Sequence, residues 1–227
     1  MTSTQDVESF EAPYDLPADP AADRASHAPD PDIVHGGHGY GTNTGISNTK
    51  LGMWLFLGSE CLLFGGLITT YLLYKIPAPG TGVGPQELFD IPFTSISSFV
   101  LLMSSLTMVL AVSAIERDDI ARFRLWIVAT ALLGSVFISG QVYEFTAFVS
   151  EGMGYTTNRS SSAFYTLTGF HGVHVTVGII MLVSTLLLSF RGHFSRANAE
   201  SVEVVGLYWH FVDVVWILIF AIVYLIP

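Results

Sequence analysis

The last twenty residues, Tyr208–Pro227, read YWHFVDVVWILIFAIVYLIP. The stretch is almost entirely apolar. At about 1.5 Å per residue, it is long enough to cross the ~30 Å hydrocarbon core of a bilayer as one helix. It nevertheless carries two ionisable side chains, His210 and Asp213, which lie one helical turn apart and therefore face the same way. The stretch predicts a membrane protein whose helices bury polar groups among themselves.

The composition of the chain also indicates a membrane protein. Of 227 residues, 51% are hydrophobic and only 12% are charged, whereas a soluble domain usually has about 25% charged residues. Eight of the 19 acidic residues lie in the first 50 positions. We interpret residues 1–50 as a disordered, acidic cytoplasmic tail, because they include too few large apolar residues to form a core. No basic patch is present that would bind nucleic acid.

Five long apolar runs follow this tail. Each is long enough to cross a bilayer as a helix, and none alternates polar and apolar residues as the strands of a membrane barrel do. We therefore predict an all-α membrane domain over residues 51–227. Its five transmembrane helices are expected at about 51–75, 92–115, 125–150, 163–190 and 204–226.

The basic residues predict the orientation of these helices. If the N-terminus is inside the cell, the inner segments hold seven Lys and Arg residues, and the outer segments hold only Lys75 and Arg159. Cytoplasmic segments of membrane proteins carry an excess of Lys and Arg. We therefore expect the N-terminus inside and the C-terminus outside.

Ionisable residues inside the predicted helices are candidates for function, because each costs about 3 kcal/mol at the centre of a spanning helix. Depths counted at about 1.5 Å per residue place them in two layers. The inner layer contains Glu60, His210 and Asp213. His210 and Asp213 are expected to pair with each other or to face Glu60. This layer either locks the helices together or interacts with protons or lipid headgroups.

The outer layer is predicted to hold a buried polar pair. Glu144 is expected to contact His171 or His174, because a carboxylate and an imidazole satisfy each other's hydrogen bonds. We predict no metal site. His171 and His174 share one helix face and cannot be opposite axial ligands of a haem iron. His174 and His210 differ in depth by about 13 Å at 1.5 Å per residue.

Four motifs occur in order on separate predicted helices: SECLLFGG, GQVYEF, GFHGVHVTVG and YWHFVDVVW. With them, residues 51–227 resemble subunit III of the haem-copper respiratory oxidases, the cytochrome c oxidase subunit 3 family. Many members have seven helices, so the chain is similar to the five-helix form of some bacterial oxidases. In several oxidases the two missing helices are supplied by an extended subunit I.

The resemblance implies an accessory subunit, without a redox centre, of a terminal oxidase in the bacterial cell membrane. Haem and copper would reside in partner subunits I and II, where oxygen is reduced to water and protons are pumped. This chain would pack on subunit I, support its proton uptake and stability, and hold phospholipid, with cytochrome c as the electron donor to the complex. Glu60 matches the buried carboxylate of the family, and Arg191 matches a basic position associated with lipid headgroups.

Other functions are weighed against this one. Subunit III of a ubiquinol oxidase is the main alternative, although Glu60 and the YWHFVDVVW motif favour a cytochrome c oxidase. A stand-alone proton-coupled transporter could use the same buried acids. Such transporters commonly have inverted repeats and broken helices, and this sequence has neither. A membrane cytochrome is disfavoured because no histidine pair has matching depths.

Overall fold

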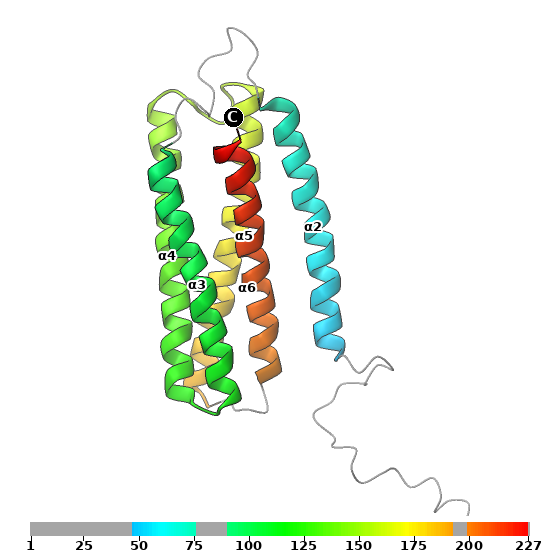
Figure 1. Cartoon of the computed structure of the whole chain (residues 1–227), viewed down its shortest axis with the longest axis vertical. Helices are drawn as coiled ribbons and strands as arrows, with labels where there is room; N and C mark the ends of the chain where they lie inside the picture. Colours follow the sequence, from blue (N-terminus) through cyan, green and yellow to red (C-terminus); the bar gives the residue numbers. More distant parts are fainter. Residues whose placement is uncertain (1–46, 76–89, 193–198, 227) are drawn as a thin grey trace, which may run out of the picture. The chain divides into compact units, whose positions relative to one another are not determined.

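The computed structural model describes residues 47–75, 90–192 and 199–226. Most of the predicted N-terminal tail therefore lies outside the described residues. The described residues form α2 (Asn48–Tyr74), α3 (Ile91–Glu116), α4 (Ile120–Ser150), α5 (Arg159–Phe190) and α6 (Ala199–Phe220), and a π-helical turn, η3 (Ala221–Leu225), continues α6 (Figure 1). In this part of the chain, five helices are long and apolar enough to cross a membrane. The prediction of an all-α, five-helix membrane protein is confirmed.

Several helices begin earlier than hydropathy predicts, because polar side chains cap them. The caps are Ser47, Asp119 and Asn158. The side-chain oxygen of each accepts a hydrogen bond from the backbone N–H three residues later, at 3.2, 3.0 and 2.7 Å respectively. Such a cap typically stabilises a helix by about 1 kcal/mol. Hydropathy detects only the part of a helix that faces lipid, whereas the backbone hydrogen bonds continue to the cap.

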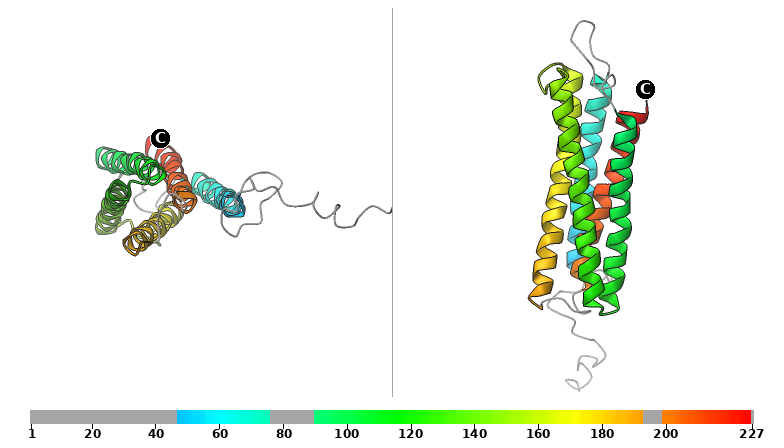
Figure 2. Two further views of the ribbon diagram at one scale, coloured as in Figure 1. Left: turned by 90° about the horizontal axis from the view of Figure 1, so that it is seen from below. Right: turned by 90° about the vertical axis from the view of Figure 1, so that its left-hand side faces the viewer.

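Four of the helices form a ring. Helix α3 packs on α4, α4 on α5, α5 on α6, and α6 closes the ring on α3, while α2 lies outside it against α5 and α6 (Figure 2). We call the end at which α2 and α6 begin the inner end, following the predicted orientation (the lower end in Figure 1). The orientation itself stays a prediction.

Trp209 of α6 forms the centre of the ring, and two glycines make room for it. A Cβ atom on Gly134 of α4 would lie 2.6 Å from the indole Cη2, and one on Gly178 of α5 would lie 2.8 Å from Cε3 and Cζ3. The indole N–H donates to the Ser104 Oγ of α3 at 3.0 Å. Trp209 is 1% exposed. One side chain thus joins four helices, which is the use that small residues have in membrane bundles.

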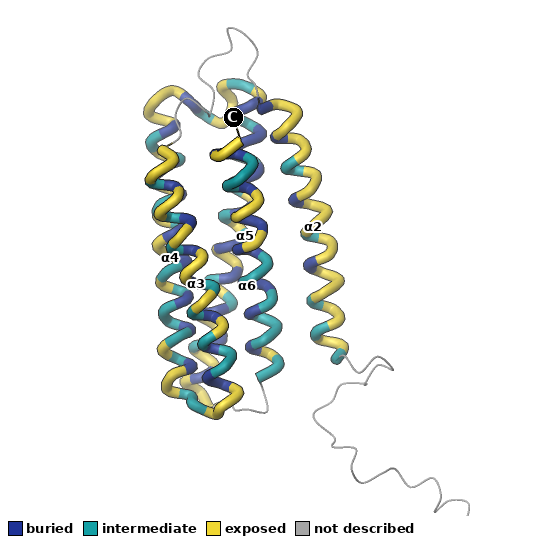
Figure 3. The backbone as a smooth tube through the Cα atoms, in the orientation of Figure 1, coloured by how far each residue is buried: buried dark blue, intermediate teal, exposed yellow. Residues whose placement is uncertain are grey.

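Helix α2 is the least buried of the five helices (Figure 3). Its side chains Leu55, Leu62 and Leu73 are 70%, 80% and 75% exposed. Its inward face contributes Phe64 and Tyr71, which are buried against α5 and α6. The chain therefore attaches α2 along a single face, and this face also carries Glu60.

Candidate functional site

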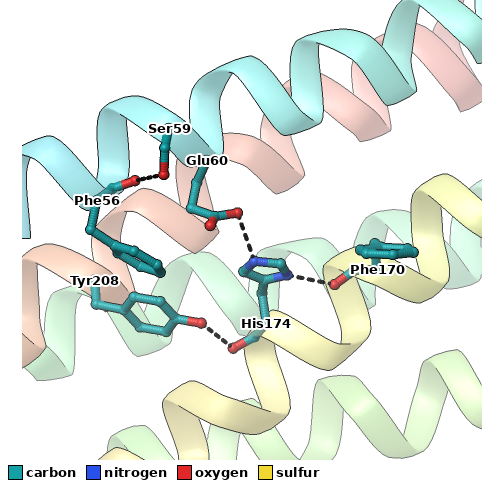
Figure 4. Close-up of polar contacts among 6 residues, drawn as sticks. All are labelled: Phe56, Ser59, Glu60, Phe170, His174 and Tyr208. Atoms are coloured by element: carbon teal, nitrogen blue, oxygen red, sulfur yellow. Dashed lines mark hydrogen bonds and ion pairs between the residues drawn. The ribbon is translucent and has the colours of Figure 1, made fainter.

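The Glu60 carboxyl group of α2 contacts the His174 imidazole of α5 between the two helices (Figure 4). The Glu60 Oε2 lies 3.1 Å from the His174 Nε2, and each side chain is 14% exposed. On the other side of the imidazole, Nδ1 lies 2.8 Å from the carbonyl oxygen of Phe170. Tyr208 of α6 donates its hydroxyl to the carbonyl oxygen of His174 at 3.0 Å. The pair is therefore held by three helices.

The geometry around His174 requires a proton between the imidazole and the carboxyl group. The Phe170 carbonyl can only accept, so the His174 Nδ1 must carry a hydrogen. An unprotonated Nε2 and a carboxylate are both acceptors and would not bond to one another. One proton consequently lies between Glu60 and His174, on the carboxyl oxygen or on Nε2. Proton sharing of this kind is the chemistry that the pair supports best.

Glu144 does not pair with a histidine, so the predicted outer pair is wrong. This carboxylate is buried, and it accepts the Thr94 hydroxyl at 2.9 Å and the Tyr224 hydroxyl at 3.3 Å. Tyr224 lies in the π-helical turn at the end of α6. The sequence indicated that the carboxylate on α4 is buried. It did not indicate that its partners would be hydroxyl groups on α3 and η3.

His171 is enclosed by aromatic rings instead of polar groups. Its ring stacks on Trp216 with centroids 4.8 Å apart, and Phe137 presents an edge at 5.9 Å. The side chain is 0% exposed, and among the described residues neither ring nitrogen has a hydrogen-bond partner. His171 acts as a packing residue in this arrangement.

The two predicted layers fail for a geometric reason. Glu60 meets His174, which was assigned to the other layer, and it does not meet His210 or Asp213. Counted from Ala163 at about 1.5 Å per residue, His174 lies about 16 Å from the outer surface of a ~30 Å hydrocarbon core, which is the height of Glu60. His174 was therefore assigned to the wrong layer, and Glu144 and His171 face different neighbours although their depths are similar.

His210 and Asp213 also have a different arrangement from the one expected. The His210 Nδ1 lies 2.6 Å from the Ser105 Oγ of α3. Asp213 is 3% exposed, and no described residue makes a hydrogen bond to either of its carboxyl oxygens. The two residues share one side of α6, as predicted, but Ser105 separates them. Ser105 is one of several serines on α3, and nothing in the sequence distinguishes it from the others.

Arg191 is exposed at the inner end of α5, where its backbone caps the helix. A second arginine that the sequence reasoning missed lies at the same end. Arg124 of α4 donates from Nε to the Ser189 Oγ at 2.9 Å and from Nη2 to the Ser189 carbonyl at 2.7 Å. Its guanidinium lies 4.6 Å from the centre of the Phe190 ring. Arg124 therefore fastens α4 to α5, and Arg191 leaves its side chain at the surface.

Metal ligands are not grouped in the part of the chain that the structure describes. Within it, no three His, Cys, Asp or Glu side chains come together in a way that could hold a metal ion. The ionisable residues instead form three small clusters, around Glu60, Glu144 and Asp213. Their polar partners come mainly from hydroxyl, imidazole and carbonyl groups.

Comparisons with known proteins agree with this architecture. The family model described as cytochrome c oxidase subunit III matches residues 29–226. Cytochrome c oxidase subunit 3 of Bacillus sp. (strain PS3) is 42% identical over 178 residues, 78% of this chain and 86% of that protein. The Synechocystis sp. protein of the same name is 41% identical over 86% of this chain and 81% of its own length. The probable quinol oxidase subunit 3 of Staphylococcus saprophyticus is 40% identical over 78% and 88%.

The fold and its polar clusters define a multi-pass membrane protein of five helices. The chain belongs to the cytochrome c oxidase subunit III family. It is therefore the subunit III of a haem-copper oxidase, an oxidoreductase complex, and membership in the family implies partner oxidase subunits.

Proposed function

We propose that this chain is a subunit without a redox centre that supports proton uptake into the catalytic subunit I during the reduction of oxygen to water. Haem and copper belong to subunits I and II in this proposal. The single observation that carries it is the 3.1 Å contact between the Glu60 carboxyl group and the His174 imidazole at the interface of α2 and α5, a hydrogen bond that needs one hydrogen between the two groups. A group that already shares a proton can pass it on with little rearrangement.

The position of this pair favours a role at a surface. Both side chains are 14% exposed, so they are accessible from outside the bundle. The residue after Glu60, Cys61, is exposed, and α2 presents a long apolar face. In our proposal this part of the bundle lies toward subunit I or a bound phospholipid. Arg191, exposed at the inner end of α5, would bind the phosphate of such a lipid.

The proposed complex is a cytochrome c oxidase in the bacterial cell membrane, with the N-terminus of this chain inside. The alternative donor is a quinol, because relatives carry both names at about 40% identity. Oxygen consumption by the purified complex, measured separately with reduced cytochrome c and with a quinol, distinguishes the two. Activity with quinol alone would contradict cytochrome c as the donor.

The proposal is tested by Glu60→Gln in the whole complex. Glutamine keeps the size of the side chain and its capacity for hydrogen bonds, but it cannot share a proton with His174. We expect the complex to assemble with normal haem content and to consume oxygen more slowly at high pH, where protons are scarce, or to lose activity faster during turnover. The measurement is oxygen consumption against time at several pH values.

Two further variants make the test specific. His174→Gln removes the other half of the pair and should have a similar effect, and combining the two substitutions should add little, because both remove the same proton. Glu151→Gln, at an exposed carboxylate on the outer end of α4, is the matched control. Wild-type rates and lifetimes for Glu60→Gln at every pH would mean that the pair only holds the helices together.

A further inference from the structure

Asp213 is a buried carboxyl group that has no part in the function proposed above. It is 3% exposed, and neither of its oxygens has a hydrogen-bond partner among the described residues. An isolated carboxylate in an apolar interior is very costly, and such a group usually binds a proton instead. Asp213 lies on α6 and makes no hydrogen bond to Glu60 or His174.

Ser105 of α3 lies next to Asp213. Its hydroxyl is close enough to interact with the Asp213 carboxyl group, although outside strict hydrogen-bond geometry, and it lies 2.6 Å from the His210 Nδ1. A hydroxyl has one hydrogen and can accept a second bond, and the hydrogen rotates freely. Ser105 can therefore accept from one neighbour while it donates to the other.

Two arrangements of hydrogens fit this row of three side chains. In the first, a neutral Asp213 donates to the Ser105 oxygen, and Ser105 donates to an unprotonated His210 Nδ1. In the second, a protonated Nδ1 donates to Ser105, and Ser105 donates to an ionised Asp213. The two arrangements differ in the position of two hydrogens, one between His210 and Ser105 and one between Ser105 and Asp213. They are therefore the start and the end of a proton transfer along the row.

His210 connects this row to the inner end of the bundle. It is half-buried and lines an open cavity of about 460 Å³ between α2, α3 and α6. The charged side chains that line the same cavity are Lys50 from α2, Glu116 from α3 and Glu203 from α6. Lys50 and Glu203 form an ion pair at 2.5 Å. The charges of Lys50 and Glu203 cancel, so Glu116 gives the cavity a net negative charge. This charge favours cations such as hydronium.

We propose that Asp213 is a buried proton-binding site that is loaded from this inner cavity through His210 and Ser105. A proton arrives from water at the His210 Nε2, and the hydrogen on Nδ1 passes to the Ser105 oxygen. The Ser105 hydrogen passes to an Asp213 oxygen, which becomes a neutral acid. His210 ends neutral with its hydrogen on Nε2, so one proton enters the row and one is bound. Release follows the same steps in reverse.

A metal cation fits this site less well than a proton. Hard cations such as Mg²⁺ and Ca²⁺ require about six oxygen ligands. The row offers one carboxyl group and one hydroxyl, and no three-residue metal cluster occurs in the described part of the chain. The chemistry of the row is therefore that of proton transfer.

The test is pH-induced infrared difference spectroscopy of the complete oxidase complex. A neutral carboxylic acid has a C=O stretch that is separate from the amide bands and shifts in D₂O. We expect Asp213→Asn to lose one such band and Glu151→Gln to keep it. We also expect Ser105→Ala to move the band to higher frequency, because the acid loses its hydrogen-bond acceptor. Identical carboxylic bands in the wild type and Asp213→Asn would overturn the proposal.

The route through His210 has its own measurement. Hydrogen–deuterium exchange of the Asp213 band should be slower in Ser105→Ala and in His210→Leu than in the wild type, and unchanged exchange in both variants would overturn the proposed path. If Asp213→Asn does not assemble, Ser105→Ala decides, because it keeps the carboxyl group, and an unshifted band would then overturn the proposal. Haem content per complex checks assembly for each variant.

Discussion

Gly178→Ala should destabilise the bundle, because the helix ring closes around Trp209. A Cβ atom at this position would lie 2.8 Å from two indole carbons and 3.3 Å from the Tyr208 Cε1, whereas carbon atoms pack at about 3.5–4.0 Å. Movement of the indole is restricted, because Gly134 also approaches it so closely that a Cβ there would lie 2.6 Å from Cη2. The indole N–H is held by Ser104.

The magnitude follows from two opposing effects. Adding a methylene to a packed core costs about 1–3 kcal/mol, and replacing glycine by alanine inside a helix stabilises it by about 1 kcal/mol. The second effect can be measured alone. Gly169, on the same helix, has no atom within 4 Å of a Cβ added to it. Gly178→Ala should therefore be about 1–3 kcal/mol less stable than Gly169→Ala.

The assay is thermal unfolding of the full-length chain in detergent, followed by circular dichroism, for the wild type and both variants. At about 2–4 °C per kcal/mol for a chain of this size, the two variants should differ by roughly 2–12 °C. Retention of the chain in the oxidase complex after mild heating should follow the same order. If Gly178→Ala unfolds at the same temperature as Gly169→Ala, the indole is not wedged between the helices and the described packing is incorrect.

Three further predictions concern other parts of the bundle. Tyr224→Phe removes a donor to the buried Glu144 and should destabilise the chain by about 1–3 kcal/mol in the same unfolding assay, and an unchanged midpoint would exclude this bond. Arg124→Gln should lower the stability because Arg124 bonds to Ser189 twice, whereas Arg122→Gln, at an exposed ion pair, should have almost no effect. The isolated chain should show no haem absorbance, whereas the complex should show it. Stoichiometric haem in the pure chain would contradict the proposal that this subunit has no redox centre.

The sequence determined the number and the nature of the helices. Membrane thickness sets the length of a span, and five runs of the chain meet that length. The buried character of Glu144, His171 and Asp213 was also predictable, because a polar side chain within a span avoids lipid by facing the interior. Hydropathy gave less exact helix ends, because caps such as Asn158 act through hydrogen bonds and not through apolarity.

The packing of the helices determines which polar groups meet. His171 and His174 are three residues apart, and this spacing separates them by roughly 60° around the helix axis. That angle directs His171 toward Trp216 in the core and His174 toward Glu60 on α2. The rotation and height of each helix are set by packing against its neighbours, as where Gly134 and Gly178 admit Trp209. The spacing of residues along one helix does not tell which residues of a neighbouring helix they contact. Partners such as Ser105 and Tyr224 are therefore identified only from the packed structure.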